Sequence, residues 1–191
     1  MEARDLGEMT YEAYIALERA SATKHEYVNG RVYAMAGGSP EHARLAQAMG
    51  GELRAALRGK PCAPFSSDLR VRVVAKGRST YPDVTVICGR VEHAIDDDGA
   101  ATNPSLIVEV LSETTESADR GDKWAHYQRI PTLGEYVLVS QSSRRIEVYS
   151  RDPEIADRWH YQEHGKGATL ALARLGVTLD VDAIYADPLV S

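Results

Sequence analysis

The stretch Pro104-Ser105-Leu106-Ile107-Val108-Glu109-Val110-Leu111-Ser112 decides how the rest of the chain is interpreted. From Leu106 to Leu111 every residue except Glu109 is apolar, and a short apolar run rich in β-branched residues predicts a strand covered on both faces. Side chains alternate along a strand, so Glu109 shares its face with Ile107 and Leu111. A lone buried carboxylate is costly unless it is protonated, paired or bound to a metal, so Glu109 needs a partner. The alternative is an edge strand on which Glu109 points to water.

Composition is that of a globular protein, with 191 residues, 43% hydrophobic and 26% charged, and we expect one domain over residues 1–191. No apolar run approaches the ~20 residues of a membrane span, and the N-terminus has no apolar signal segment, so we expect a cytoplasmic protein without a membrane partner. The net charge of −6 argues against a protein that coats nucleic acid by charge alone. Cys62 and Cys88 lack CxxC spacing and predict neither a disulfide framework nor a four-thiolate zinc site.

The N-terminal part carries clear turn and capping residues. Thr10 predicts the cap of a short helix over about residues 11–19, and Asn29-Gly30 between alternating residues predicts a type I′ hairpin over residues 24–36. Ser39-Pro40-Glu41 predicts the start of a longer helix that ends near residue 58. His42 lies on the inward stripe of that helix, either as a core histidine or as a functional one.

The remaining patterns predict a mixed α/β domain with one central sheet. We expect strands at residues 65–74, 81–88, 106–111, 135–140 and 145–150, further strands near the C-terminus, and a helix at residues 118–129. The strand–helix–strand step from Glu109 to Val137 predicts a right-handed crossover between parallel strands. Residues 89–103 are expected to form a long loop in which Asp96-Asp97-Asp98 is solvated, because these acids lack the spacing of an EF-hand.

Two carboxylates and a lysine are expected to form a site. Asp83 opens one strand and Glu109 lies within the next, so the two can converge if the strands are neighbours. Oxygen-only ligands suit Mg²⁺ or Mn²⁺. Lys123 shares the inward helix stripe with Tyr127 and Ile130 and would place a positive charge beside the metal, an arrangement that suits phosphodiester hydrolysis. The alternative is a structural Asp–Lys–Glu network in the core.

These pieces resemble the PD-(D/E)XK nuclease superfamily and, more closely, a restriction endonuclease-like family of bacterial proteins. The matching segments cover about residues 10–150, and their order and spacing together are more specific than any one segment. They are His25-Glu26-Tyr27-Val28-Asn29-Gly30, Ser39 with His42, Ser67-Asp68-Leu69-Arg70-Val71, Tyr81-Pro82-Asp83-Val84, Glu109-Val110-Leu111-Ser112, Asp119, Lys123, Tyr127 and Glu135-Tyr136.

The resemblance implies a restriction endonuclease-like mixed central sheet with an αβββαβ core at about residues 39–150. An N-terminal helix and β-hairpin would occupy residues 10–38, and a C-terminal extension with extra strands would occupy residues 151–191. It also implies Asp83 and Glu109 as metal ligands. The superfamily usually carries a lysine two residues after the glutamate, where this sequence has Leu111, and the resemblance implies that Lys123 takes that role. Secondary candidates to complete the site are His42, Asp68, Glu26 and Tyr127.

The expected function is a Mg²⁺- or Mn²⁺-dependent endonuclease that hydrolyses phosphodiester bonds of nucleic acid, with DNA as the expected substrate. We expect a homodimer, because two symmetric active sites would suit cleavage of both strands. The alternative is a non-catalytic nucleic-acid- or partner-binding module on a nuclease fold, which fold alone does not separate from an enzyme. A third hypothesis is a Mg²⁺ enzyme that acts on a small phosphate or nucleotide.

Overall fold

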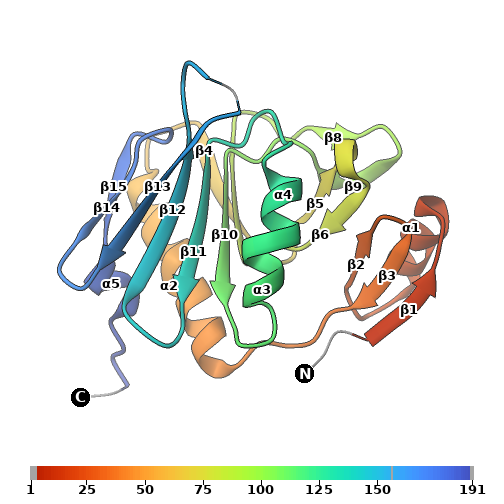
Figure 1. Ribbon diagram of the computed structural model, residues 1–191, viewed down its shortest axis with the longest axis horizontal. Coiled ribbons are helices and arrows are strands. Elements are labelled where there is room, and N and C mark those ends of the chain that lie inside the picture. Colours follow the sequence, from red (N-terminus) through yellow and green to blue (C-terminus); the bar gives the residue numbers. More distant parts are fainter. Residues whose placement is uncertain (1–3, 156, 190–191) are drawn as a thin grey trace.

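Two mixed β-sheets form the framework of the protein (Figure 1). The computed structural model describes residues 4–155 and 157–189. One sheet has six strands, in the order β13 (Trp159–Gly165), β12 (Arg145–Arg151), β11 (Glu135–Ser140), β10 (Leu106–Leu111), β7 (Val84–Cys88) and β4 (Cys62–Ser66). The other has seven strands, in the order β1 (Arg4–Glu8), β3 (Arg31–Ala34), β2 (His25–Val28), β6 (Arg78–Thr80), β5 (Arg70–Val73), β9 (Asp97–Ala101) and β8 (His93–Ala94). A separate antiparallel pair consists of β14 (Thr169–Leu172) and β15 (Val177–Asp180).

The helices are few, as expected for this mixed α/β fold. They are α1 (Tyr11–Ala20), α2 (Pro40–Ala56), α3 (Glu116–Ala118), α4 (Trp124–Tyr127) and α5 (Val181–Tyr185), with a 3₁₀ turn at Val74–Lys76 and a π-helical turn at Asp119–Lys123. The predicted start of α2 is confirmed, because the side chain of Ser39 accepts a hydrogen bond from the backbone N–H of His42 at 3.0 Å and Pro40 follows it. The predicted hairpin is also confirmed, since Asn29 and Gly30 both have positive φ, at 49° and 93°, between β2 and β3.

Strand β10 lies in the interior and separates two apolar cores. Its residues Leu106, Val108 and Val110 pack in the core that contains α2, and Ile107 and Leu111 pack in the core that contains α4. Helix α2 and the paired α3 and α4 therefore cover opposite faces of the six-stranded sheet (Figure 1). Successive residues of β10 therefore point alternately into the two cores, as in a strand covered on both faces, and all six are buried.

The crossover that follows β10 is parallel, as predicted. β10 pairs with β11 from Leu106 opposite Glu135 to Leu111 opposite Ser140. On its other side, β10 pairs antiparallel with β7, so that Val108 lies opposite Val84. The C-terminal strands are also present, and β14, β15 and α5 add Leu170, Leu179 and Ile184 to the core on the α2 side.

The prediction of one central sheet is wrong in one respect, because the chain passes between two sheets. The expected strand at residues 65–74 is in fact two strands, with β4 in the six-stranded sheet and β5 in the seven-stranded one. The expected turn at residues 75–80 contains β6, and the chain then returns through Tyr81-Pro82-Asp83 to β7. In the sequence, residues 65–74 read as one strand, because the alternation of apolar and charged residues from Asp68 to Val73 gives no sign of a change of sheet.

The loop expected at residues 89–103 contains strands β8 and β9, and the expectation that its acids are solvated is wrong for Asp97. Asp97 is 1% exposed and accepts hydrogen bonds from Arg70 at 2.6 and 3.0 Å and from the Tyr11 hydroxyl at 2.7 Å. A buried carboxylate requires such partners. They come from distant parts of the chain, so no local pattern revealed them.

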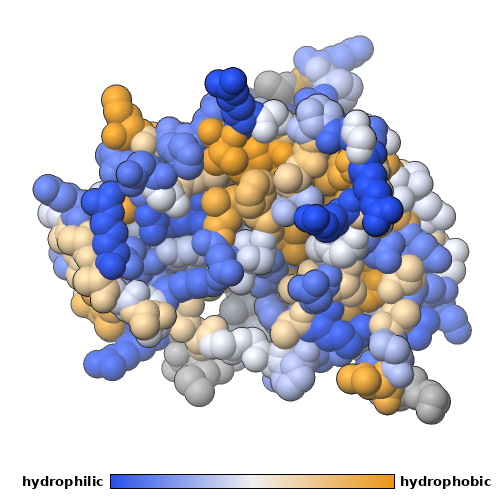
Figure 2. Space-filling view, turned by 180° about the vertical axis from the view of Figure 1, so that it is seen from behind, coloured by the Kyte–Doolittle hydropathy of each residue, from blue (hydrophilic) through white to orange (hydrophobic). Residues whose placement is uncertain are grey.

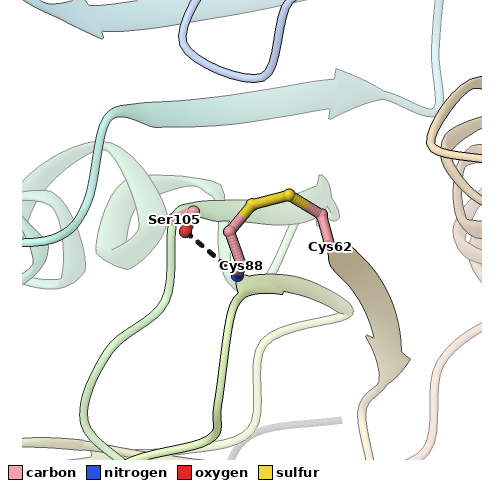
Figure 3. Close-up of a disulfide and its surroundings, with 3 residues drawn as sticks. All are labelled: Cys62, Cys88 and Ser105. Carbon is pink, nitrogen blue, oxygen red and sulfur yellow. Dashed lines mark hydrogen bonds between the residues drawn. A yellow bond between two sulfur atoms is a disulfide. The ribbon is translucent and has the colours of Figure 1, made fainter. Parts of the chain in front are cut away.

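The two cysteines form a disulfide, which the sequence did not predict (Figure 3). Cys62 and Cys88 lie directly opposite each other where β4 pairs with β7, and their Cα atoms are 3.9 Å apart. The backbone N–H of Cys88 donates a hydrogen bond to the Ser105 hydroxyl at 3.3 Å. Spacing in the sequence carries no information about this pairing, which depends on the register of two strands.

Most of the face opposite to that of Figure 1 is polar, with apolar residues gathered in its upper middle part (Figure 2). Among the residues that the structure describes, no helix is both long enough and apolar enough to cross a membrane. The longest helix, α2, instead buries one stripe, formed by Leu45, Met49 and Leu53.

The buried carboxyl group of Glu135 makes fold stability depend on pH. Glu135 is fully buried, and its Oε1 accepts a hydrogen bond from the backbone N–H of Arg174 at 3.1 Å, whereas Oε2 has no hydrogen-bond partner among the described residues. Burial raises the pKa of Glu135 from 4.5 to about 7. The folded state thus holds this proton more tightly than the unfolded chain, and the resulting stabilisation is full below about pH 4.5 and is lost as the pH rises towards 7.

We expect Glu135→Gln to remove this pH dependence, because the amide has a similar shape and does not titrate. In the wild type, the titration of Glu135 should lower the free energy of unfolding by about 1–3 kcal/mol between pH 4.5 and 8. Urea unfolding of both proteins across this range measures the difference in slope. Parallel stability–pH curves for the two proteins would contradict the assignment.

Candidate functional site

Asp83 and Glu109 meet at the boundary between β7 and β10. If the antiparallel register that pairs Val84 with Val108 is continued by one residue, Asp83 lies opposite Glu109. The Oδ2 atom of Asp83 accepts a hydrogen bond from the backbone N–H of Val110 at 2.7 Å, which holds Asp83 against β10. Glu109 itself is 3% exposed and shares its face with Ile107 and Leu111, so the edge-strand alternative is wrong.

A helical segment next to β10 supplies the cation. One regular α-helix was expected at residues 118–129, but a π-helical turn at Asp119–Lys123 lies between α3 (Glu116–Ala118) and α4 (Trp124–Tyr127). Such wide turns are frequent at functional sites. The turn is held against the sheet by the hydroxyl of Tyr136, which donates a hydrogen bond to the carbonyl of Asp119 at 3.0 Å. Trp124 also stacks on the Tyr136 ring, with 5.3 Å between centroids.

Lys123 lies among carboxylates, as its inward helix position predicted. Its Nζ is 2.9 Å from Oδ1 of Asp119, 3.1 Å from Oε1 of Glu109 and 3.8 Å from Oε1 of Glu26. The hydroxyl of Tyr127, one helical turn further on, donates a second hydrogen bond to Oε1 of Glu109 at 2.8 Å. Lys123 is 8% exposed and Tyr127 is fully buried.

The seven-stranded sheet contributes a further carboxylate. Glu26 on β2 accepts hydrogen bonds from the Thr80 hydroxyl and, at 3.4 Å, from the Arg78 guanidinium, both on β6. The acidic cluster, defined here as Glu26, Asp83, Glu109 and Asp119, therefore draws on both sheets and on the helical segment between them.

His42 reaches the cluster from the first turn of α2. Its Nε2 is 2.8 Å from Oδ1 of Asp83, and both side chains are partly exposed, at 20% and 15%. The hydrogen bond to Asp83 raises the pKa of His42 above its ordinary value of 6.5, although burial opposes the charged form. Both oxygens of Asp83 are thus engaged, one by His42 and one by the backbone of β10.

Burial dominates the electrostatics of the cluster. Burial raises the pKa of Glu109 to about 8, with Lys123 opposing the shift and Asp119, Asp83 and Glu26 adding to it through repulsion. This agrees with the raised pKa expected of a buried carboxylate beside another acid. Burial disfavours the charged form of Lys123, but the carboxylates of Glu109, Glu26 and Asp119 outweigh it and hold the pKa of Lys123 well above 10.5. For Glu26, Lys123 and Arg78 outweigh burial, and its pKa is lowered.

The structure brings most of the predicted site residues together, with one exception. Glu26, His42 and Tyr127 join Asp83, Glu109 and Lys123 in the cluster. Asp68 does not: its side chain is 83% exposed in the turn between β4 and β5, where it pairs with Lys24 at 2.6 Å. Asp68 lies outside the cluster because it follows β4, at the point where the chain has already left the six-stranded sheet.

Asp119 lies in the acidic cluster and Arg78 contacts it, but neither was predicted as a site residue. Asp119 lies four residues before Lys123, a spacing that places two helical residues on one face and so was the available signal. No sequence pattern indicated Arg78, because a turn was expected at its position and a turn does not predict the direction of its side chain. In the structure, Arg78 contacts Glu26.

The donor set of the cluster fits a hard divalent cation. Its members offer oxygen atoms only, which is the preference of Mg²⁺ and Mn²⁺. Oδ1 of Asp119 is buried without a hydrogen-bond partner among the described residues, although it has the Lys123 ammonium as a counter-charge. Within residues 4–155 and 157–189, however, no three His, Cys, Asp or Glu side chains already stand around one point in the arrangement of a metal site. The oxygens are instead held by Lys123, Tyr127 and His42.

Comparison with known proteins adds a family and a fold. Residues 11–182 match the model of the family Uma2, described as "Putative restriction endonuclease". Two relatives come from Synechocystis sp. "Uncharacterized protein slr1290" is 34% identical over 174 residues, which is 91% of this chain and 90% of that protein. "Uncharacterized protein sll1609" is 33% identical over 143 residues, 75% of this chain and 81% of that protein.

A solved structure has the same fold. It is the crystal structure of "a putative nuclease belonging to DUF820" from Anabaena variabilis, with a TM-score of 0.69 and 13% sequence identity. The similarity covers 86% of this chain and 91% of that one. At this identity the likeness concerns the fold alone, and it confirms the restriction endonuclease-like mixed α/β architecture.

The hydrogen bond from Tyr127 to Glu109 should contribute measurably to stability. We expect Tyr127→Phe to lower the free energy of unfolding by about 1–3 kcal/mol at pH 9, where Glu109 is largely ionised and loses a buried donor. Equilibrium urea unfolding measures the loss. A matched control is Tyr27→Phe, since Tyr27 is 9% exposed and its hydroxyl makes no hydrogen bond within the described part of the chain. Equal losses in the two variants would argue against a specific contribution from the Tyr127 hydroxyl.

Proposed function

Because the chain belongs to the Uma2 family of restriction endonuclease-like proteins, we propose that it is a metal-dependent endonuclease that hydrolyses phosphodiester bonds of nucleic acid. The observation that carries the proposal is the meeting of Asp83 and Glu109 across two neighbouring strands with the Lys123 ammonium 3.1 Å from Glu109. Two carboxylates with an adjacent lysine are the parts that metal-assisted phosphodiester hydrolysis requires.

Mg²⁺ or Mn²⁺ is the proposed cofactor, held by Asp83 and Glu109. When bound, such an ion lowers the pKa of a coordinated water and neutralises charge on the phosphate. The chain's own residues prepare the site for this. His42 and the backbone N–H of Val110 fix the orientation of the Asp83 carboxylate. Tyr127 fixes that of Glu109.

Lys123 is the proposed source of positive charge beside the substrate phosphate. Leu111, at the position where the superfamily usually has its lysine, is 4% exposed and packs in the core with Ile107 and Leu138, so no ammonium is available from the strand. The π-helical turn brings Lys123 to the same carboxylate from the neighbouring helix. A compact ammonium held by carboxylates is well suited to stabilise the charge that develops on a phosphate oxygen.

DNA is the proposed substrate and the cytoplasm the proposed location. A reducing cytoplasm would hold Cys62 and Cys88 as thiols, and four further residue pairs would still connect β4 with β7. We also propose a homodimer, whose two sites would cut both strands of a duplex. Sedimentation at micromolar concentration tests this, and a purely monomeric profile with DNA present would contradict it.

The alternative is a non-catalytic binding module, and it makes a different prediction for an assay of nucleic-acid cleavage. It would bind nucleic acid without cleaving it, whatever metal is supplied. The replacement of the usual strand lysine by Leu111 is the observation in its favour. Binding measured beside cleavage, with duplex DNA, single-stranded DNA, RNA and free nucleotides, separates the two hypotheses and the small-phosphate hypothesis.

We expect Lys123→Ala to abolish cleavage while the protein stays folded. A charge of this kind is worth about 3–4 kcal/mol in the transition state, which is roughly a hundred- to a thousandfold in rate. Asp83→Asn and Glu109→Gln should also be inactive, since each removes a proposed metal ligand. Cleavage is measured with Mg²⁺ and with Mn²⁺, and circular dichroism verifies the fold.

Asp68→Asn is the matched control, because this carboxylate is exposed and lies outside the acidic cluster. It should cleave at the wild-type rate. If wild-type protein cleaves and Lys123→Ala cleaves equally well with the same metal dependence, then Lys123 has a structural role only.

A further inference from the structure

The ammonium of Lys123 lies among three carboxylates of the acidic cluster. Three of the four carboxylates in the acidic cluster lie within 3.8 Å of its Nζ: Asp119, Glu109 and Glu26. Each comes from a different element: the π-helical turn, β10 and β2. A single positive charge thus lies between these carboxylates, and Lys123 is buried, at 8% exposure.

Asp119 shows that the lysine fills this position incompletely. Its Oδ1 is 2.9 Å from Nζ, yet it has no hydrogen-bond donor among the described residues, because the ammonium does not approach it at the angle of a hydrogen bond. Asp119 is 1% exposed. A buried carboxylate oxygen with a counter-charge but no donor is unusual, and such an atom can accept a further ligand.

The balance of charge supports the same conclusion. The acidic cluster contains four carboxyl groups, whereas the cations in contact with it are Lys123, Arg78 and, when protonated, His42. Arg78 contacts Glu26 from the far side, at Oε2, 3.4 Å away. Within the described residues, Lys123 is the cation that pairs with both Glu109 and Asp119, so its movement would separate the charge that these two carboxylates share.

We propose that Lys123 is a place-holder for the divalent cation and that Asp119 is a further carboxylate of the metal site. This inference rests on the proposed function and deepens it. Asp83, Glu109 and Asp119 would hold the cation, and Lys123 would give up its ion pairs with Glu109 and Asp119. The displaced Lys123 becomes available to a substrate phosphate. The same residue thereby compensates the charge of the buried carboxylates while no metal is bound.

The proposal predicts that removal of the ammonium strengthens metal binding. In the wild type, part of the binding free energy is used to break the ion pairs of Lys123, whereas Lys123→Met leaves the position open with a side chain of similar length. We expect the dissociation constant for Mn²⁺, measured by calorimetry, to fall at least tenfold. Lys123→Gln is the second variant, in case the methionine protein does not fold, and circular dichroism is recorded before each titration.

The control distinguishes displacement from a general change in charge. Arg78→Met also removes one buried positive charge in contact with the cluster, but Arg78 does not lie between Glu109 and Asp119. Its affinity for Mn²⁺ should change much less than that of Lys123→Met. An equal gain in both variants would overturn the proposal, because net charge alone would then explain it.

The role of Asp119 is tested in the background that lacks the lysine. Comparison of Lys123→Met with Lys123→Met/Asp119→Asn isolates the contribution of Asp119 to metal binding from its contact with the ammonium. We expect the double variant to bind Mn²⁺ at least tenfold more weakly than Lys123→Met. Unchanged affinity in the double variant would overturn the assignment of Asp119.

These results can be separated from those of the nuclease assay. If Lys123→Met binds Mn²⁺ no better than the wild type, the place-holder role fails, while the proposed nuclease activity can still be observed in the wild type. If the affinities change as expected but the wild type cleaves no nucleic acid, the proposed function fails and the place-holder role stands. The rise in melting temperature on addition of Mn²⁺ gives a second, activity-independent measure, and it should be largest for Lys123→Met.

Discussion

The ion pairs of Lys123 are the interaction on which the arrangement of the site depends. One ammonium lies within 3.8 Å of carboxylates from β2, β10 and the π-helical turn. Each carboxylate alone would be costly to bury, and the lysine alone would be as well. Together they hold the two sheets and the helical segment in contact through a polar centre, with apolar cores on either side of β10.

The surrounding packing makes this polar centre possible. The core with α2 packs on one face of β10 and the core with α4 on the other, which holds Glu109 in the interior. Tyr136 anchors the π-helical turn through its hydroxyl and its stacked contact with Trp124. These contacts fix the backbone of the π-helical turn, and so the position from which Asp119 and Lys123 reach the cluster, as a catalytic or metal-binding site needs.

The same physics connects stability with function. The buried carboxylates resemble a metal site in which the Lys123 ammonium takes the place of the metal ion. A divalent ion would bind there with favourable free energy only if the ammonium could move away. Glu109, with a pKa raised by burial to about 8, and Lys123, with a pKa raised by its carboxylates, therefore belong to one unit whose charge is shared. Hydrogen bonds from Tyr127 to Glu109 and between His42 and Asp83 orient the carboxylate oxygens of the cluster.

The sequence alone determined those features that rest on local patterns. The buried strand around Glu109, the hairpin at Asn29-Gly30, the capped start of α2 and the inward position of Lys123 all follow from periodicity and capping, which act over a few residues. Tertiary structure decided the rest: the change of sheet after β4, the burial of Asp97, the Cys62–Cys88 bridge, the exposure of Asp68 and the inclusion of Arg78 and Asp119 in the site. These depend on strand register and on contacts between residues far apart in the chain, because a side chain's partners are set by which strands become neighbours and not by the residues beside it.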